Sequence, residues 1–434
     1  MKIAVIGSGI AGNSAAWALH HANHHVTLFE ADNRAGGHAA TVTIDYDGTP
    51  VSVDTGFIVY NEHNYPDLVG LFDELGVETI ASNMSFCVSR RTGHRKRQEW
   101  NLSDYTAILA SAPNFLRPSF RKLVSEIRRF ARQSIEDLEA GRLAGLTLGD
   151  YCKRYDPALG EEFLLPMGAA IWSTPGGDFT KFPADSFVQF FANHRILDWN
   201  SPVWYTVKGG SENYVRKLLA PLLGRIRMAS PVDRVRRHGN QVFINVRGEP
   251  QEEAFDAVIF ACHSDQALAA LADPSDLEAE VLSSVPYKTN KVYLHRDPSF
   301  MPKNRAKWAS WNYMDLTEDG RHDRDICVTY WMNRLQSIDK SKPLFVTLNP
   351  PDAPRSDLVF GEYEYAHPAF DGASMEAQTK LPAIQGARGT YFCGAWTGYG
   401  FHEDGLRSGL DVAELLGARI PWRAASVAVA DAAE

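Results

Sequence analysis

The feature that most constrains the fold lies in the first 31 residues. An apolar run at residues 2–6, KIAVI, leads into the glycine-rich turn GSGIAG and then into NSAAWALHH, which is rich in alanine. This order predicts a strand, a tight turn and a helix. The apolar segment HVTLFEA, residues 25–31, predicts a second strand that ends on an acid. Together these segments predict a βαβ unit of the Rossmann type.

The glycine spacing also predicts what this unit binds. Gly7 permits the tight turn, Gly9 lets a diphosphate approach the backbone, and Gly12 lets the helix pack closely against the strand. Backbone N–H groups at the start of the helix, at Ile10 and Ala11, then face the anion. The motif therefore predicts a dinucleotide site.

The segment after the second strand favours FAD over NAD. Glu30 is placed to accept hydrogen bonds from the adenosine ribose and to repel a 2′-phosphate, which disfavours NADP. The longer flavin cofactor needs a second close backbone approach and a nearby cation, which RAGG supplies; a solvated acid and an ordinary surface turn are the alternatives. His38 follows and is a candidate for covalent attachment. The predicted contacts here are Glu30, Ala31, Arg34, Gly36, Gly37 and His38.

The length of 434 residues predicts two globular units that are interleaved in sequence. Segments such as KGGSENYVRKLLAPL, AFDAVIFAC and TYFCGAW return to the nucleotide domain, whereas the intervening stretches are richer in aromatic residues and proline. We expect an α/β fold, α+β overall, in which the substrate domain has a mixed sheet and helices. The predicted ranges are 1–75, 205–270 and 385–420 for the FAD domain, 76–204 and 271–384 for the substrate domain, and 421–434 for a poorly ordered tail.

Composition restricts the class of protein. Hydrophobic content of 44%, charged content of 22% and the lack of an apolar run of about 20 residues predict a soluble protein. The N-terminus lacks the pattern of a secretory signal, so we expect a cytoplasmic location. The net charge of -9 disfavours nucleic acid as a partner. Five scattered cysteines and the HHANHH run offer no ligand spacing for a metal site.

Several motifs together resemble a known family. VIGSGIAG, Glu30 with ADNRAGGH, SPVDRV at 230–235 and the closing GAW through GLRSG occur in the order seen in the flavin-containing amine oxidase superfamily. More narrowly, KTNKVYLHRD, TYWMNRLQ and GAWTGYGFHEDGLRSG resemble a bacterial branch of NAD/FAD-binding oxidoreductases. That branch is often associated with cyclopropane-fatty-acid-synthase-like methyltransferases. It is similar to the oxidoreductase that desaturates methylated acyl chains on the route to furan fatty acids.

The resemblance implies an amine-oxidase-like fold and further cofactor contacts. Val232 would hold the adenine through backbone bonds, and Ala261 would line the cofactor. The helix opened by Glu403, Asp404 and Gly405 would favour negative charge on the reduced flavin. Many members carry an acid after the glycine of the final strand. This chain has Gly394, Ala395 and Trp396 there, which leaves the pyrophosphate and ribityl contacts open.

Candidate catalytic residues are few because flavin carries the redox step itself. The resemblance places Lys291, in KTNKVYLH, near the reactive nitrogen of the flavin; a surface lysine at a strand edge is the alternative. His402 is a candidate acid or base, or it only caps the turn. Candidate walls of an apolar substrate pocket, with ordinary core residues as the alternative, are Trp172, Trp204, Trp396 and Tyr399.

Two basic segments stand out against the acidic background. The stretch SRRTGHRKR, residues 89–97, predicts a hairpin tip, and residues 114–133 predict an amphipathic helix with six arginines or lysines. Such a helix can rest on anionic lipid, so together they predict a membrane-surface contact for a lipid-borne substrate.

These features favour FAD-dependent dehydrogenation of an apolar, lipid-derived acyl chain, with electrons passing on to oxygen or another acceptor. An amine oxidase that uses Lys291 and a non-catalytic flavin-binding protein are the alternatives.

Overall fold

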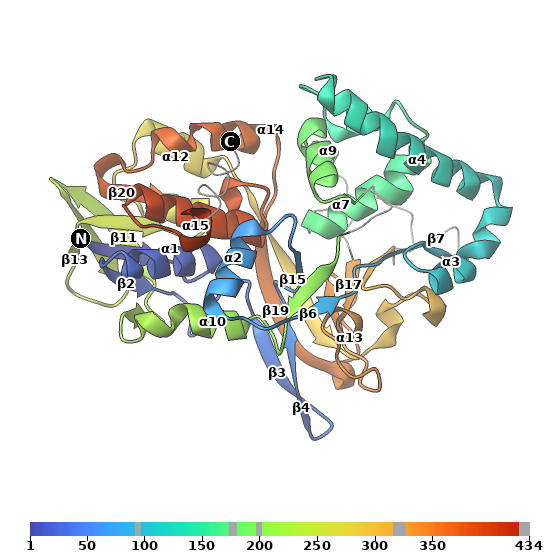
Figure 1. The fold of residues 1–434 in the computed structure, drawn as a ribbon, viewed down its shortest axis with the longest axis horizontal. Helices are drawn as coiled ribbons and strands as arrows, with labels where there is room; N and C mark the ends of the chain where they lie inside the picture. Colours follow the sequence, from blue (N-terminus) through green and yellow to red (C-terminus); the bar gives the residue numbers. More distant parts are fainter. Residues whose placement is uncertain (92–96, 173–179, 197–201, 316–326, 425–434) are drawn as a thin grey trace.

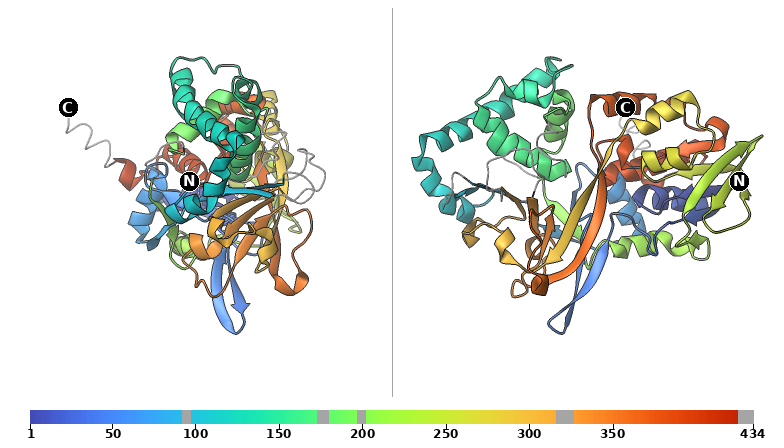
Figure 2. Two further views of the ribbon diagram at one scale, coloured as in Figure 1. Left: turned by 90° about the vertical axis from the view of Figure 1, so that its right-hand side faces the viewer. Right: turned by 180° about the vertical axis from the view of Figure 1, so that it is seen from behind.

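The computed structural model describes residues 1–91, 97–172, 180–196, 202–315 and 327–424. Figure 1 shows two lobes: one holds the N-terminus and the helices α1 and α15, and the other holds the helices α4, α7 and α9. The right view of Figure 2 shows the same division from behind, with the β3–β4 hairpin projecting between the lobes. This mixed architecture confirms the predicted α/β fold class.

The first lobe is built on a five-stranded parallel sheet in the order β10-β2-β1-β14-β20. Its central strand β1 is almost wholly buried, as expected for a strand that has neighbours on both sides and helices over its faces. The strands are β1 (Lys2–Ile6), β2 (His25–Phe29), β10 (Ile226–Arg227), β14 (Ala257–Phe260) and β20 (Thr390–Phe392). They come from all three ranges that the sequence assigns to the FAD domain.

Helices α1 (Ile10–His21) and α15 (His402–Leu415) pack closely together on this sheet. A side chain at Gly409 would overlap the backbone oxygen of Ala11, so glycine is what lets the two helices approach. Helices α10 (Glu212–Leu219) and α2 (Pro66–Leu75) lie beside them.

The structure also contains three smaller antiparallel sheets. Strands β11 (Val232–His238), β12 (Gln241–Val246) and β13 (Glu253–Phe255) form one of them. Strands β3 (Thr41–Tyr46) and β4 (Thr49–Asp54) form the hairpin. A third sheet has the order β5-β9-β6, with β5 (Tyr60–Asn61), β9 (Trp204–Val207) and β6 (Thr79–Ser82).

The second lobe contains a seven-stranded mixed sheet in the order β19-β15-β18-β17-β16-β7-β8. Its strands are β7 (Phe86–Arg91), β8 (Arg97–Asn101), β15 (Tyr287–His295), β16 (Trp311–Met314), β17 (Cys327–Trp331), β18 (Phe345–Leu348) and β19 (Val359–Pro368). All of them fall in the two ranges that the sequence assigns to the substrate domain. Strands β7 and β8 pair as the predicted hairpin, whose tip at residues 92–96 lies outside the described residues.

Helices cover one end of this sheet (Figure 1). They are α3 (Tyr105–Ser111), η1 (Ala112–Leu116), α4 (Pro118–Glu139), α5 (Leu148–Cys152), α6 (Pro157–Leu159), η2 (Gly160–Leu164), α7 (Leu165–Trp172) and α9 (Ala184–Asn193). Helix α13 (Met332–Leu335) follows β17. Helices α11 (Ser264–Ala270), α12 (Asp276–Ser283) and α14 (Gly372–Lys380) lie on the first lobe. Within the described ranges, no helix is both long and apolar enough to cross a membrane.

The prediction of a poorly ordered tail at residues 421–434 is wrong for its first four residues. Trp422 stacks against Trp17, with ring centroids 6.0 Å apart, and its Nε1 donates to Asp67. Arg423 pairs with Asp67, Asp411 and Glu414. These contacts fix residues 421–424 on α2 and α15, whereas residues 425–434 lie outside the described residues.

Candidate active site

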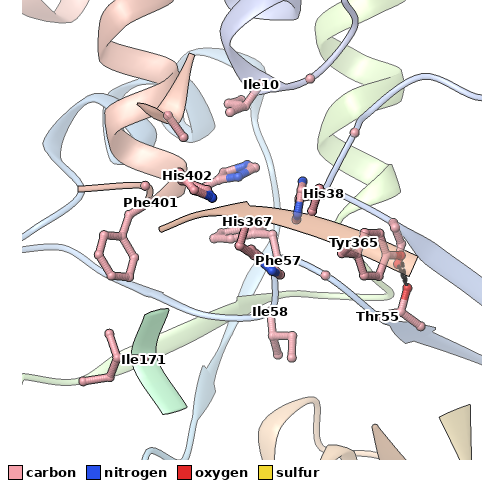
Figure 3. A pocket seen from close by; sticks show the side chains of 18 of the residues that line it. Ile10, His38, Thr55, Phe57, Ile58, Ile171, Tyr365, His367, Phe401 and His402 are labelled. Atoms are coloured by element: carbon pink, nitrogen blue, oxygen red, sulfur yellow. Dashed lines mark hydrogen bonds between the residues drawn. The ribbon is translucent and has the colours of Figure 1, made fainter. Parts of the chain in front are cut away.

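A cavity of about 1960 Å³ runs from the glycine-rich turn after β1, past β19, to the helices of the second lobe. Figure 3 shows part of its wall, where His38, His367 and His402 lie near one another, with Phe401, Ile171 and Ile58 on one side. Both lobes therefore contribute to one continuous space. Such a space between domains is the usual location of a cofactor and substrate site.

The turn after β1 has the shape that the glycine motif predicts. Gly7 has φ +104°, and a side chain there would come 2.7 Å from the backbone oxygen of Ala261. A side chain at Gly12 would overlap the oxygen of Gly7. At Gly9, by contrast, nothing lies within 4 Å of the space that a Cβ would take, and this residue lines the cavity. Gly7 and Gly12 thus form the turn, and Gly9 leaves its backbone open to a ligand.

A second glycine turn lies directly against the first. The Gly36 N–H donates to the oxygen of Ser8 at 2.8 Å. A Cβ at Gly37 would lie 3.0 Å from the Cα of Gly9. Arg34 fixes this turn by donating to the oxygens of Gly37, at 2.7 Å, and Ala39, at 3.3 Å. The two turns form one backbone cradle at this end of the cavity.

Glu30 both lines the cavity and braces the cradle. Its Oε2 accepts from the Ser8 backbone N–H at 2.8 Å and from the Ser8 hydroxyl. Its Oε1 accepts from the Asp32 N–H at 2.9 Å. A carboxylate oxygen accepts more than one bond, so capacity remains for a ribose hydroxyl.

Two buried ring nitrogens without a partner test whether the cavity fits a polar cofactor. His38 Nε2 and Trp396 Nε1 are buried and have no hydrogen-bond partner among the described residues, and both side chains line the cavity. A buried polar group without a partner is costly, so such groups normally meet a ligand or water. The open backbone at Gly9 and these two ring nitrogens fit a dinucleotide whose other end carries polar ring atoms.

The cavity brings together most of the predicted cofactor contacts. Those that line it are Gly7, Gly9, Ile10, Ala11, Glu30, Ala31, Arg34, Gly37, His38, Val232, Ala261, Gly394 and Ala395. Gly12 and Gly36 shape the two turns without lining the cavity. Within the described part of the chain, no group of three or more histidine, cysteine or acidic side chains could hold a metal ion.

The predicted contacts at the start of α15 need correction. Glu403 is 3% exposed and accepts from the Asp67 and Leu68 N–H groups, at 2.8 and 3.0 Å, so it caps α2. Asp404 caps α15 itself by accepting from the Tyr399 and Phe401 N–H groups. Gly405 lets α15 pack on Ile10. None of these three residues lines the cavity. Phe401 and His402 do line it, so the N-terminus of α15 still faces the cavity.

His402 is neutral at physiological pH. Its Nε2 lies 2.6 Å from the hydroxyl of Tyr214, and its ring stacks on Phe57 with centroids 3.8 Å apart. Burial lowers the pKa of His402 to about 3. The surroundings thus argue against the predicted acid or base role, since an imidazole with this pKa is a poor proton carrier near neutrality.

A second group of imidazoles, those of His38 and His367, lies near His402. His367 lies with its ring centroid 5.0 Å from that of His38, and its Nδ1 lies 2.8 Å from Asn290 Nδ2. Because Asn290 Oδ1 accepts from Asn349, Nδ2 is the donor and Nδ1 of His367 accepts. Burial lowers the pKa of His367 to about 4, and that of His38 well below its usual value. Neutral His367 therefore carries its proton on Nε2.

Lys291 lies outside the cavity wall, which contradicts its predicted position. The side chains of β15 alternate, so Asn290 and Val292 are buried whereas Lys291 is exposed. Its Nζ pairs with Glu362 at 2.6 Å and has a side-chain exposure of 48%. This is the surface lysine of the alternative interpretation.

The four candidate pocket aromatics divide into two pairs. Trp204 and Trp396 line the cavity. Trp172 and Tyr399 are absent from the wall: Nε1 of Trp172 donates to the Tyr399 oxygen at 3.1 Å, and its ring packs among phenylalanines of α9. The core interpretation is correct for this second pair.

Away from the cradle, the cavity becomes an arm with apolar and aromatic walls. The side chains of this arm include Phe86, Phe163, Met167, Ile171, Trp204, Val292, Trp311, Tyr330 and Leu348. Two carboxylates occur among its described residues. Asp104 is paired with Arg334 at 2.7 Å, and Glu364 lies exposed on β19. The arm therefore suits an uncharged chain better than a cation.

Comparison with known families establishes the class of protein to which the chain belongs. A model of flavin-containing amine oxidoreductases matches residues 10–355. The chain belongs to this family. It is accordingly an FAD-dependent oxidoreductase, and the hypothesis of a non-catalytic flavin carrier is not retained. FAD supplies two-electron redox chemistry in this flavoprotein when it is bound.

Solved structures share the fold of this flavoprotein. A putrescine oxidase bound to putrescine matches with a TM-score of 0.68 and 15% identity, over 96% of this chain and 100% of the other. A fatty acid isomerase of P. acnes that produces CLA matches with a TM-score of 0.62 and 16% identity, over 96% of this chain and 99% of the other. A putative protoporphyrinogen oxidase of Exiguobacterium matches with a TM-score of 0.66 and 15% identity, over 96% of this chain and 98% of the other.

The sequence interpretation missed the polar residues of β19 that line the site. Tyr365 donates to or accepts from the Thr55 hydroxyl at 2.7 Å, as Figure 3 shows, and His367 lies two residues further along. The segment EYEYAHP alternates with the period of a strand. That alternation places Tyr363, Tyr365 and His367 on one face of the strand. It is the feature of the sequence from which these residues could have been identified.

Proposed function

We propose that this flavoprotein dehydrogenates an apolar, lipid-derived acyl chain such as a methylated fatty acyl group. The observation that carries the proposal is the arm, whose apolar wall continues directly from the cofactor cradle. Dehydrogenation removes two electrons and two protons from adjacent carbons. A bound flavin would take up a hydride, which carries both electrons and one proton, the second proton would leave to water, and the electrons would then pass to oxygen or another acceptor. A methyltransferase that acts on the same chain would supply the substrate.

The residues of the arm would bind and orient the chain rather than exchange protons with it. Phe163, Met167 and Ile171 come from η2 and α7 and provide apolar contact area. The imidazoles of His38, His367 and His402 are uncharged, so they add hydrogen-bonding groups without placing a charge beside the chain. An environment of this kind excludes water and favours hydrocarbon.

Amine oxidation is the less favoured alternative. A diamine substrate needs carboxylates that can face its ammonium groups. In the described part of the arm, Asp104 is already paired with Arg334, and Glu364 is exposed. Lys291, the proposed lysine of such an enzyme, points to the surface. The likeness to a fatty acid isomerase supports an acyl chain only as an analogy of fold.

The experiment is incubation of the purified holoenzyme with a phospholipid that carries a methylated acyl chain, with oxygen as acceptor. We expect a product two mass units lighter, with a new double bond, by mass spectrometry. Putrescine, tested in parallel, should give no peroxide. Oxidation of putrescine together with unchanged lipid would contradict the proposal.

A variant that carries a charge in the arm, compared with a matched control, tests whether the arm binds the chain. Ile171→Asp puts a carboxylate on the apolar wall, whereas Leu223→Asp makes the same kind of change at an exposed site of the other lobe. Ile171→Asp should keep its flavin absorbance and lose lipid turnover, and Leu223→Asp should keep both. Full lipid turnover by Ile171→Asp would show that the arm does not bind the chain.

A further inference from the structure

Helix α3, η1 and the start of α4 combine exposed apolar and basic side chains at the outer edge of the second lobe. Figures 1 and 2 both place them at the end of the molecule opposite the N-terminus. We define the α3–α4 face as Ile108, Leu109, Leu116, Arg117, Arg121, Arg128 and Arg132. This face is distinct from the cradle and was only partly anticipated from the sequence.

The apolar part of the face is unusual for a protein surface. Leu116 is 81% exposed, Leu109 is 55% exposed and Ile108 is 42% exposed. Large apolar side chains that are scattered singly need no explanation, but these three lie within nine residues on α3 and η1, two helices that contact each other, and we call them the apolar patch. Leu116 directly precedes Arg117, so the patch continues into the basic helix.

The basic part forms a stripe. Arg117, Arg121, Arg128 and Arg132 are spaced by four, seven and four residues, which places them within about 60° of one another around a helix. All four are exposed. Arg121 Nη1 donates to the Phe115 oxygen at 2.9 Å, which holds this guanidinium over η1 beside the apolar patch.

Acidic side chains are few along most of the stripe, and the exposed Glu136 and Glu139 occur only near the end of α4. Glu126 is the only acidic residue from Ala112 to Gln133, and it is buried, with its oxygens on Arg129 and on the Asp156 N–H. The whole chain has a net charge of -9, so this local concentration of cations runs against the overall charge. Such a surface complements an anionic partner.

The cavity reaches the same face. Ile108 lines the cavity and is also exposed to solvent, and Ile127 of α4 lines it from beneath the stripe. The apolar arm therefore opens beside the patch. A chain that left a lipid layer at this point would enter the arm without crossing water.

We propose that the α3–α4 face docks on an anionic lipid bilayer, with Leu109 and Leu116 in the acyl layer and the arginine stripe on the headgroup phosphates. Exposed leucines favour a membrane over a nucleic acid, because insertion into hydrocarbon stabilises them whereas contact with phosphate does not. The docking stands on this surface alone. Delivery of substrate into the arm rests also on the proposed function.

The other basic stretch contributes less than the sequence suggests. Arg90, at its start, lies 3.4 Å from Glu161 and 3.5 Å from Glu162 in ion pairs within the protein. Residues 92–96 fall outside the described residues. The docking surface is therefore assigned to α3, η1 and α4.

Co-sedimentation of the holoenzyme with vesicles tests the proposal. We expect binding to vesicles that contain phosphatidylglycerol, little binding to pure phosphatidylcholine, and weaker binding as salt rises. Replacing all four arginines of the stripe by glutamine should lower the partition coefficient by about 100-fold or more. Leu109→Gln with Leu116→Gln should also lower it, whereas Leu223→Gln with Leu415→Gln, at exposed leucines elsewhere, should not.

Flavin absorbance and melting temperature, measured for each variant, exclude misfolding as the cause. Equal binding to both kinds of vesicle, or undiminished binding by the arginine variant, would overturn the proposal. So would binding of duplex DNA as tightly as anionic vesicles. If anionic vesicles bind as expected but no acyl chain is oxidised, the docking stands and the proposed function fails.

Discussion

A Cβ on Gly37 would lie only 3.0 Å from the Cα of Gly9, so the two glycine turns of the cradle meet backbone to backbone. Neither turn alone would enclose a diphosphate. The first supplies the N-terminus of α1, and the second closes over it and is held by Arg34. This contact explains why one chain needs glycines in both places.

Gly9→Val should weaken flavin binding strongly without unfolding the protein. The space around a Cβ at Gly9 is empty, so the valine fits the fold but occupies the open side of the cradle. We expect the Kd for FAD to rise on the order of 100-fold, with little change in melting temperature. Isothermal titration with FAD measures this. Gly372→Val, also in open space but outside the cavity wall, is the control and should bind FAD normally.

Lys291→Met should retain catalysis. The ammonium of Lys291 is half exposed and pairs with Glu362 outside the cavity. Removing an exposed pair should change stability little and should leave the rate of flavin reduction within about twofold of the wild type. Stopped-flow absorbance at the flavin band measures that rate. A large loss of rate would reinstate the lysine as a residue of the active site.

The rate of flavin reduction should not depend on a histidine that titrates near neutrality. Burial lowers the pKa of His367 to about 4 and that of His402 to about 3, and lowers that of His38 as well. His367 and His402 are thus neutral across the range from about pH 5 to 8, and the rate should be level there. A bell-shaped profile with a midpoint between 6 and 7 that persists in Glu403→Gln would point to a charged imidazole.

Glu403 should make the protein less stable as pH rises. Burial raises its pKa from 4.5 to about 7. The folded state then holds more protons than the unfolded state between these values, so the free energy of unfolding falls as pH rises through this window. The change amounts to about 2–3 kcal/mol.

Glu403→Gln isolates this effect, because glutamine cannot ionise but still offers one oxygen to the α2 N-terminus. Relative to the wild type, the variant should gain about 2–3 kcal/mol of unfolding free energy between pH 5 and pH 8. Urea unfolding at the two pH values gives the difference. A pH-independent difference would mean that Glu403 is ionised throughout.

The sequence predicted the cradle well because its determinants are local. Gly7, Gly9 and Gly12 act within one turn, and Glu30 follows at the end of the neighbouring strand. Lys291 was misplaced by resemblance, although the alternation of β15 separates it from Val292 on the wall. Glu403 was misassigned because its partners, Asp67 and Leu68, lie more than 300 residues away in sequence. No local pattern reports such a contact.

The arm could not be located from sequence for the same reason. Its walls come from α7, β7, β16 and β15, which meet only after the mixed sheet has formed. Aromatic content predicted a pocket but could not separate Trp204, on the wall, from Trp172, in the core. The choice depends on tertiary packing rather than on residue type.

Anaerobic mixing of the oxidised holoenzyme with a methylated phospholipid tests the central claim most directly. Without oxygen, electrons taken from the acyl chain remain on the flavin, so the account predicts bleaching of its visible absorbance in proportion to the lipid consumed. Putrescine at the same concentration should leave the spectrum unchanged. Bleaching by the diamine, with none by the lipid, would contradict the account.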